Sequence, residues 1–309
     1  MSHPHVIVFG SINMDLVAKV PRLPVPGETL IGHTFSTVSG GKGANQAVAV
    51  ARLGIPTFMV GRVGGDDFGQ DLLTSLQTNG VQTNGVLVEQ SARSGVAMIA
   101  VDDQGENHII VISGVNRRIN EEDVERLTHL LPGAAALLLQ FEIPLLAVQV
   151  AAEAAQKAGV KVILDPAPAL TNLPTDLYPL LDIITPNAVE AEQLVGFPVN
   201  DLEAAAQAAT VLRQRGVDTV VIKLGAQGVF CATADETFFL PAFAVQTIDT
   251  VAAGDAFNGG LAVALAEGLS LKRAIVWGAA AGALATTKAG AQTSMPERNI
   301  FNAFLQEKQ

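Results

Sequence analysis

Two carboxylates, Asp249 and Asp255, flank a turn of small residues within the segment Asp249–Phe257. An apolar pattern at helical spacing begins at Phe257 and ends at Gly268, which predicts a helix that starts at this turn. The first amides of such a helix lack helical partners and carry partial positive charge, and small side chains let an anion approach them. We therefore predict an anion hole at the helix start, formed by Ala252, Ala253 and Gly254.

Asp255 is the unusual residue at this helix start. Its carboxylate would repel a resting phosphate, so we interpret it as a general base that faces a hydroxyl group, which in turn attacks the phosphate. The alternative is that Asp255 is an ordinary acidic residue in a first helical turn, where negative charge is favoured. The other motifs of the chain are needed to choose between these two interpretations.

A second glycine-rich turn, Ser39–Ala47, enters another apolar helical pattern that stops at Gly54. Lys42 and Asn45 fall on the first turns of this predicted helix. Glycines there bring the backbone close to a polar ligand, and the two side chains add hydrogen-bond donors. The segment is not a P-loop, because the glycine spacing and the Lys-Ser/Thr pair of that motif are absent. An ordinary strand–turn–helix with a solvated Lys42 is the alternative.

Polar residues also follow predicted strands at the point where each strand ends. The apolar run Val6–Phe9 predicts a buried parallel strand, and Asn13 and Asp15 come just after it. Glu142 similarly follows the apolar run 136–139. Because ligands of open α/β sheets bind at the carboxyl ends of the strands, we expect these side chains to lie near a ligand.

Two further segments at strand ends are candidates for a nucleotide and its metal. Asn187 and Glu190 follow the short strand 183–184 at a spacing that puts both on one helix face, where a carboxylate could hold a hydrated magnesium ion. Alternatively, Glu190 is a solvated acid in a first turn. The segment Lys223–Gly228 contains two glycines that would let a nucleotide lie on the backbone, although a plain hairpin explains them equally well.

The elements around these residues predict the fold class. From about residue 120 onward, strands and helices alternate regularly and end in two apolar helices, which predicts an α/β fold with a doubly wound, mostly parallel sheet flanked by helices. Two stretches, approximately 16–39 and 95–112, instead contain short alternating strands and turn residues. We expect them to form a small β-sheet lid on a single domain that spans 1–309.

Composition narrows the class of protein. The 309-residue chain is 49% hydrophobic and can bury a full core, and its net charge of −11 argues against nucleic acid or an anionic membrane as a partner. Cys231 lies in an apolar run typical of a buried, inert thiol, and the histidines lack the spacing of zinc ligands. The N-terminal stretch 1–5 has no signal-peptide pattern, and no window approaches the roughly 20 apolar residues of a membrane span. A cytoplasmic protein is expected.

Five motifs carry a resemblance to a known family, and in sequence order they are Gly10–Asp15, Pro26–Thr29, Gly40–Ala47, Asn187–Glu190 and Asp249–Phe257. Together they resemble the signature set of the ribokinase-like sugar kinases, over essentially the whole chain. The resemblance is specific, because five motifs in one order do not coincide by chance.

This resemblance implies ATP-dependent phosphorylation of D-ribose at its 5-hydroxyl group, with Asp255 as the base that takes the hydroxyl proton. It implies that the sugar is bound by Asn13, Asp15, Gly41, Lys42, Asn45 and Glu142. It implies that ATP is bound by Asn187, Lys223, Gly225, Gly228 and Gly254, with magnesium held by Glu190 through water. The lid strands should carry exposed apolar faces that pair two subunits into a homodimer.

Two departures from the family pattern leave the choice of nucleotide base open. Ala279 is apolar where related sequences often carry a polar residue near the adenine, and Lys223 replaces a common hydroxyl residue. The alternative functions are a kinase of deoxyribose or of another sugar, and a sugar- or nucleotide-binding protein without catalysis. The joint presence of Asp255, its anion hole and the pair Asn187 and Glu190 argues against the second alternative.

A potassium site is expected beside the anion hole. Asp249 offers a carboxylate and Val251 a carbonyl group just before the helix, and hard cations bind several such oxygens. By the family resemblance, the segment after the last long helix completes the site with the carbonyl groups of Ala285, Lys288 and Gly290 and the hydroxyl group of Ser294. The alternative is that Asp249 merely caps a turn.

Overall fold

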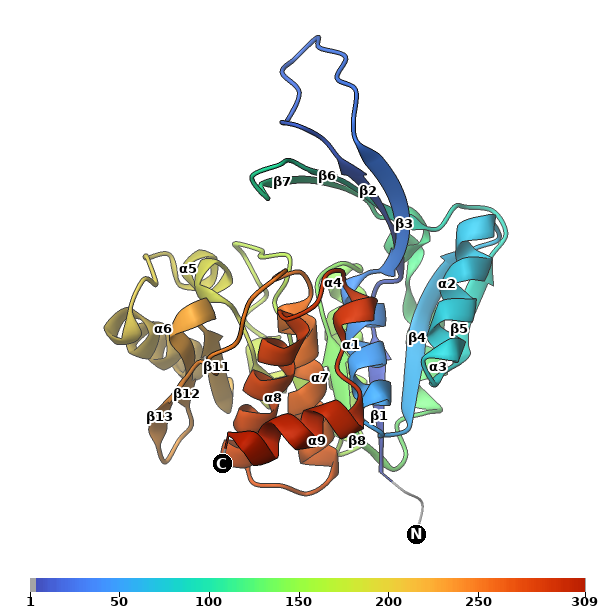
Figure 1. Cartoon of the computed structure of the whole chain (residues 1–309). Helices are drawn as coiled ribbons and strands as arrows, with labels where there is room; N and C mark the ends of the chain where they lie inside the picture. Colours follow the sequence, from blue (N-terminus) through green and yellow to red (C-terminus); the bar gives the residue numbers. More distant parts are fainter. Residues whose placement is uncertain (1–3, 309) are drawn as a thin grey trace.

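A nine-stranded sheet forms the centre of the computed structural model, which describes residues 4–308 (Figure 1). Its strands, in spatial order, are β13 (Thr237–Pro241), β12 (Gly228–Ala232), β11 (Thr219–Lys223), β10 (Ile183–Ile184), β9 (Lys161–Leu164), β8 (Ala134–Leu139), β1 (His5–Phe9), β4 (Thr57–Gly64) and β5 (Val81–Glu89). Neighbours from β11 to β5 run parallel, whereas β12 is antiparallel to both of its neighbours, β11 and β13. The predicted mostly parallel sheet is therefore confirmed. Residues 1–3, which belong to the N-terminal stretch considered above, lie outside the described residues.

Helices cover both faces of this sheet. They are α1 (Lys42–Arg52), α2 (Asp67–Thr78), α3 (Glu121–Thr128), α4 (Leu145–Lys157), α5 (Ala188–Val195), α6 (Leu202–Gln214), α7 (Ala253–Ala266), α8 (Leu271–Ala285) and α9 (Arg298–Glu307). Short 3₁₀ turns lie at η1 (Gly114–Arg118), η2 (Tyr178–Leu180), η3 (Gly225–Gln227) and η4 (Gln292–Ser294). Side chains of β1 alternate between two apolar clusters, one shared with α1, α2, α7, α8 and α9 and the other with α3 to α6, so the sheet is doubly wound.

The elements of the main body that the sequence analysis did not identify include α9 and β5. The two predicted final helices are α7 and α8, but a third helix, α9, follows them and buries only Phe301 and Leu305 of its ten residues. Strand β5 lies at the edge of the sheet with half-exposed residues. Both elements are amphipathic and lack a long apolar run, which is the signal that identified the other elements. No helix within residues 4–308 has the length and apolar character needed to span a membrane.

A separate four-stranded sheet projects from the main body above the carboxyl ends of the strands (Figure 1). Its strands, in spatial order, are β3 (Thr34–Gly40), β2 (Asn13–Lys19), β6 (Gly95–Val101) and β7 (Asn107–Ile112). The sheet starts at Asn13 and not near residue 16, because Asn13 already pairs with Gly40 of β3 and Gly95 of β6. Asn13 and Asp15 are thus part of the first strand of this sheet, which we call the lid.

Candidate active site

A cavity of about 810 Å³ opens at the carboxyl ends of the central strands, beside the start of α7. It brings together residues from segments far apart in the chain that the sequence analysis selected, namely Lys42, Asn187, Glu190, Lys223, Gly225, Gly228, Ala252, Ala253, Gly254, Asp255 and Ala279. The predicted sugar residues Asn13, Asp15, Gly41, Asn45 and Glu142 do not line this cavity. Hydrogen bonds connect several of them to Lys42 and Asp255, so they form an adjoining cluster.

Close packing of α1 against α7 positions the carboxylate of Asp255. A Cβ atom added at Gly259 of α7 would lie only 2.5 Å from the Cβ of Ala49 in α1, so the two helices approach more closely than ordinary side chains allow. This approach brings two amide side chains of α1 to Asp255: the Asn45 Nδ2 donates to its Oδ2 at 3.0 Å, and the Gln46 Nε2 donates to its Oδ1 at 3.1 Å. These hydrogen bonds fix the orientation of the Asp255 carboxylate. Asn45 and Asp255 are 210 residues apart in the sequence, so the site exists only in the folded chain.

Burial sets the electrostatic character of Asp255, which is only 4% exposed. Burial raises the pKa of its carboxyl group to about 6; the charge of Lys42 opposes this increase, and that of Asp165 adds to it. Lys42 is the counter-charge: burial lowers the pKa of its ammonium group, but the surrounding carboxylates, Asp255 first among them, raise it above the ordinary value. A carboxylate poised close to neutral pH is suited to accept a proton from a hydroxyl group.

A second cluster of polar residues lies at the junction of the main sheet and the lid. Glu142 Oε2 accepts hydrogen bonds from the Ser11 hydroxyl, from Asn13 Nδ2 at 3.3 Å and from the Lys42 amide at 3.1 Å. Burial, together with the charges of Glu142 and Asp255, raises the pKa of Asp15 to about 7. Several carboxylates and amides at one place can bind the hydroxyl groups of a sugar.

Glycine at two positions allows the start of α1 to reach this cluster. Gly41, the residue before α1, has a φ of 90°, and a Cβ atom there would lie 2.7 Å from the Asn13 amide nitrogen. A Cβ atom on Gly43 would lie 2.7 Å from the Ser11 amide nitrogen. Neither position can carry a side chain without moving the backbone, so both glycines are required for the contact between α1 and the end of β1.

The start of α7 differs in one respect from the predicted anion hole. Ala252, which precedes the helix, adopts a left-handed conformation with a φ of 58°, at a cost of about 1–2 kcal/mol for a non-glycine residue. The Ala253 amide donates back to the Thr250 carbonyl at 3.3 Å, and its predicted role in the anion hole stays a prediction. Gly254 and Asp255 then supply the first-turn amides beside the cavity, and the strained backbone at Ala252 orients them.

Asn187 and Glu190 form a reciprocal cap at the start of α5, where the sequence analysis expected both on one helix face. Asn187 precedes the helix, and its side chain accepts from the Glu190 amide at 2.9 Å. The two Glu190 carboxylate oxygens accept from the Asn187 amide and from its Nδ2, both at 2.8 Å. Burial and the charge of Asp165 raise the pKa of Glu190, which is 8% exposed and therefore not the solvated acid of the alternative interpretation.

Two residues of the site were not selected from the sequence. Asp165 directly follows β9, is 3% exposed and accepts a hydrogen bond from Lys223 Nζ at 2.9 Å and from Gln46 Nε2 at 3.2 Å. Gln46 thus bridges Asp165 and Asp255. The signal for Asp165 was present, because a carboxylate after an apolar run is the pattern that selected Glu142. For Gln46 the sequence offered no signal beyond its place in the glycine-rich segment.

Asp249 links the turn before α7 to the segment after α8. Its Oδ1 accepts from the Val251 amide at 3.0 Å, so it does cap a turn, and its Oδ2 accepts from the Gly290 amide at 2.9 Å. The amides of Ile248 and Asp249 both donate to the Thr286 carbonyl. The two segments predicted to share a potassium ion therefore lie side by side.

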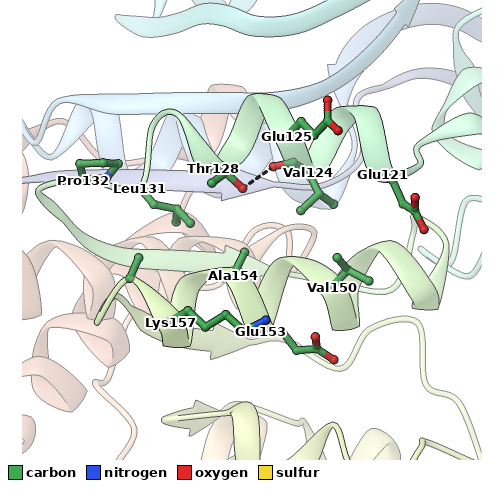
Figure 2. Close-up of a pocket in the computed structure, with 11 residues that line it drawn as sticks. Glu121, Val124, Glu125, Thr128, Leu131, Pro132, Val150, Glu153, Ala154 and Lys157 are labelled. Carbon is green, nitrogen blue, oxygen red and sulfur yellow. Dashed lines mark hydrogen bonds between the residues drawn. The ribbon is translucent and has the colours of Figure 1, made fainter.

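A groove of about 550 Å³ between α3 and α4 lies elsewhere on the surface (Figure 2). Its walls are the apolar side chains of Val124, Leu131 and Val150, with Glu121 and Glu153 at the edge. No predicted site residue lines it. Cys231 lies apart from both cavities, is fully buried in β12, and burial raises its thiol pKa to about 12, in agreement with an inert role.

Comparisons with known proteins agree with this geometry. The model of the pfkB family carbohydrate kinases matches residues 3–298. A ribokinase of Haemophilus influenzae is 44% identical over 299 residues, 97% of each chain, and a deoxyribokinase of Salmonella typhi is 35% identical over 97% of this chain and 98% of that one. The structure of Arabidopsis thaliana ribokinase complexed with ribose and ATP has a TM-score of 0.91 at 34% identity and covers 99% of both chains. The chain, in which the buried carboxylate of Asp255 lies at a helix start beside this cavity, therefore belongs to the pfkB family of carbohydrate kinases.

Proposed function

We propose that the protein transfers the γ-phosphoryl group of ATP to the 5-hydroxyl group of D-ribose, giving D-ribose 5-phosphate and ADP. The observation that carries this proposal is the buried Asp255 carboxylate, held by Asn45 and Gln46 between the cavity and the polar cluster around Glu142. The ribokinases among the related proteins support ribose as the sugar. A cytoplasmic location, where ATP and reduced thiols are found, is part of the proposal.

In the proposed reaction, Asp255 accepts the proton of the 5-hydroxyl group as its oxygen forms a bond to the γ-phosphorus. The bond between that phosphorus and the bridging oxygen breaks, and ADP leaves with the electron pair. The amides of Gly254 and Asp255 stabilise the negative charge on the transferred group, which is the main contribution that a protein makes to phosphoryl transfer. Asn13, Asp15, Asn45 and Glu142 orient the sugar, and the lid closes over it to exclude water.

The residues of the site are suited to bind the two expected cations, magnesium and potassium. Glu190 lines the cavity, and each of its oxygens accepts one hydrogen bond and keeps a free lone pair, so it suits a magnesium ion held through water. That ion would neutralise phosphate charge. Potassium would lie beside the start of α7, where Asp249 links the two segments that supply its ligands. These ligands would be the Asp249 carboxylate, the carbonyl groups of Val251, Ala285, Lys288 and Gly290, and the hydroxyl group of Ser294.

One assay distinguishes the proposed function from two others, phosphorylation of 2-deoxyribose and binding without catalysis. Release of ADP is measured with D-ribose, 2-deoxyribose, other pentoses and hexoses, and we expect the highest kcat/KM with D-ribose. A preference for 2-deoxyribose would assign the protein to the activity of the related deoxyribokinase. Binding of sugar and ATP without ADP release would make it a binding protein and would exclude catalysis.

The lid should join two subunits. All residues of β7 are exposed, and four in succession are aliphatic, with Ile110 63% exposed. Such an apolar edge strand pairs readily with a second strand. We expect sedimentation of the protein at micromolar concentration to give a dimer, and Ile110→Asp to give a monomer. The matched control is Leu146→Asp, which alters a 66% exposed aliphatic residue of α4 outside the lid and should leave the dimer intact. A wild-type monomer would contradict the proposed pairing.

A further inference from the structure

The ammonium group of Lys223 lies against the start of α7. A Cβ atom added at Gly254 would be 3.2 Å from Lys223 Nζ, so the charge is next to the first-turn amides and on the same helix start as Asp255. The side chain is 14% exposed and comes from the end of β11, whose neighbour β10 leads into Asn187. The absence of a side chain at Gly254 thus gives Lys223 direct access to the region of the anion hole.

A buried pair with Asp165 holds Lys223 in this position. The distance between Lys223 Nζ and Asp165 Oδ1 is 2.9 Å, and the second oxygen of Asp165 is held by Gln46. A buried ion pair contributes little to stability, because desolvation of both charges offsets their attraction. Its location between the base Asp255 and the cap formed by Asn187 and Glu190 therefore points to a role in the reaction.

The charges of the site also favour a cation next to the transferred phosphoryl group. The Ala253 amide is engaged by Thr250, so the anion hole has one donor fewer than the helix start could offer. The cavity is lined by the carboxylates Asp165, Glu190 and Asp255, which would repel the phosphates of ATP. An ammonium group has three donors, of which Asp165 occupies one, leaving the others for phosphate oxygens.

We propose that Lys223 contacts the transferred phosphoryl group of ATP and stabilises its charge during transfer, with Asp165 as the residue that positions it. This inference rests on the proposed kinase function and goes beyond the ATP contact that the resemblance implies for Lys223: its ammonium group acts as a catalytic group, and Asp165 and Gln46 support it. Asp165 is not expected to touch the nucleotide.

The test compares Lys223→Met with the double variant Lys223→Met/Asp165→Asn. We expect Lys223→Met to lower kcat by about 100-fold, as for loss of one donor to transition-state charge, while KM for the sugar changes less than about twofold. Affinity for a non-hydrolysable ATP analogue, measured by calorimetry, should fall by about tenfold, whereas affinity for ADP changes less than about twofold, because only the analogue carries the γ-phosphate.

The double variant separates this role from a structural one. The single variant leaves Asp165 buried without its partner, which alone can destabilise the fold and repel phosphate. Replacing both charges removes that effect and should restore the melting temperature, but kcat should stay at least about tenfold below that of the wild type. A double variant with wild-type kcat and a wild-type ratio of affinities for the non-hydrolysable ATP analogue and ADP would overturn the proposal. The binding measurements need no sugar, so they decide on Lys223 even if D-ribose is not the substrate.

Discussion

Replacing Asp255 by asparagine is expected to lower kcat by at least about 100-fold, the effect typical of removing a positioned base. Binding of ATP and sugar should change little, because the carboxamide has the size of the carboxylate. The fold should accommodate it: Asn45 Oδ1 is buried and has no hydrogen-bond partner within residues 4–308, so the Asn45 amide can turn over and accept from the new carboxamide. The neutral group also avoids the cost of burying a charge.

The measurement is turnover by ADP release together with calorimetric titration of ATP and sugar. Asp235→Asn provides the control, because this aspartate is exposed in the turn between β12 and β13. Near-normal turnover of Asp255→Asn would remove Asp255 from the mechanism. If the variant instead binds neither ATP nor sugar and has a lower melting temperature, the carboxylate has a structural role.

The pH profile provides a second readout of the same variant. Burial raises the pKa of Asp255 to about 6 and that of Asp15 to about 7, so both carboxylates lose their charge as the pH falls through this range. We expect kcat/KM of the wild type to decrease with falling pH there, because the base must be ionised. In Asp255→Asn the remaining decrease should move to lower pH, because the charge of Asp255 helps to raise the pKa of Asp15. An unchanged profile would be inconsistent with Asp255 as the titrating base.

Local patterns predicted those parts of the molecule that local interactions determine. The strands β1 and β10 lie where the sequence analysis predicted them, because short apolar runs define both. The same rule placed Glu142 and Lys223 at strand ends. It would also have selected Asp165, which follows β9 in the same way.

Contacts between distant segments were not predictable from such patterns. The hydrogen bonds from Asn45 and Gln46 to Asp255 depend on how closely α1 can approach α7, which Gly259 and Ala49 determine together. The bond from the Ala253 amide to Thr250 depends on the left-handed turn at Ala252, a conformation that the sequence does not specify for alanine. Conformation and tertiary contact, and not residue type, thus decide which donors are free in the site.

Potassium is expected to raise kcat by about tenfold over a bulky organic cation at equal ionic strength, with little change in KM. The reason lies in the link between Asp249 and Gly290, which joins the turn before α7 to the segment after α8. A cation bound to the oxygens of both segments would neutralise Asp249 and hold the strained turn at Ala252 in place. Because this turn orients the first-turn amides, which we propose stabilise the transition state, the effect should appear in kcat.

The decisive variant is Asp249→Asn, which removes the charge but keeps a side-chain oxygen for one of the two backbone amides that Asp249 binds. We expect it to show the same rate in potassium, in sodium and in the organic cation, at saturating magnesium-ATP. Asp235→Asn, in an exposed turn away from this link, should retain the wild-type response to potassium. If the wild type itself gives equal rates in all three cations, Asp249 serves only to cap the turn and to tie it to Gly290, and the preorganisation of the helix start needs no ion.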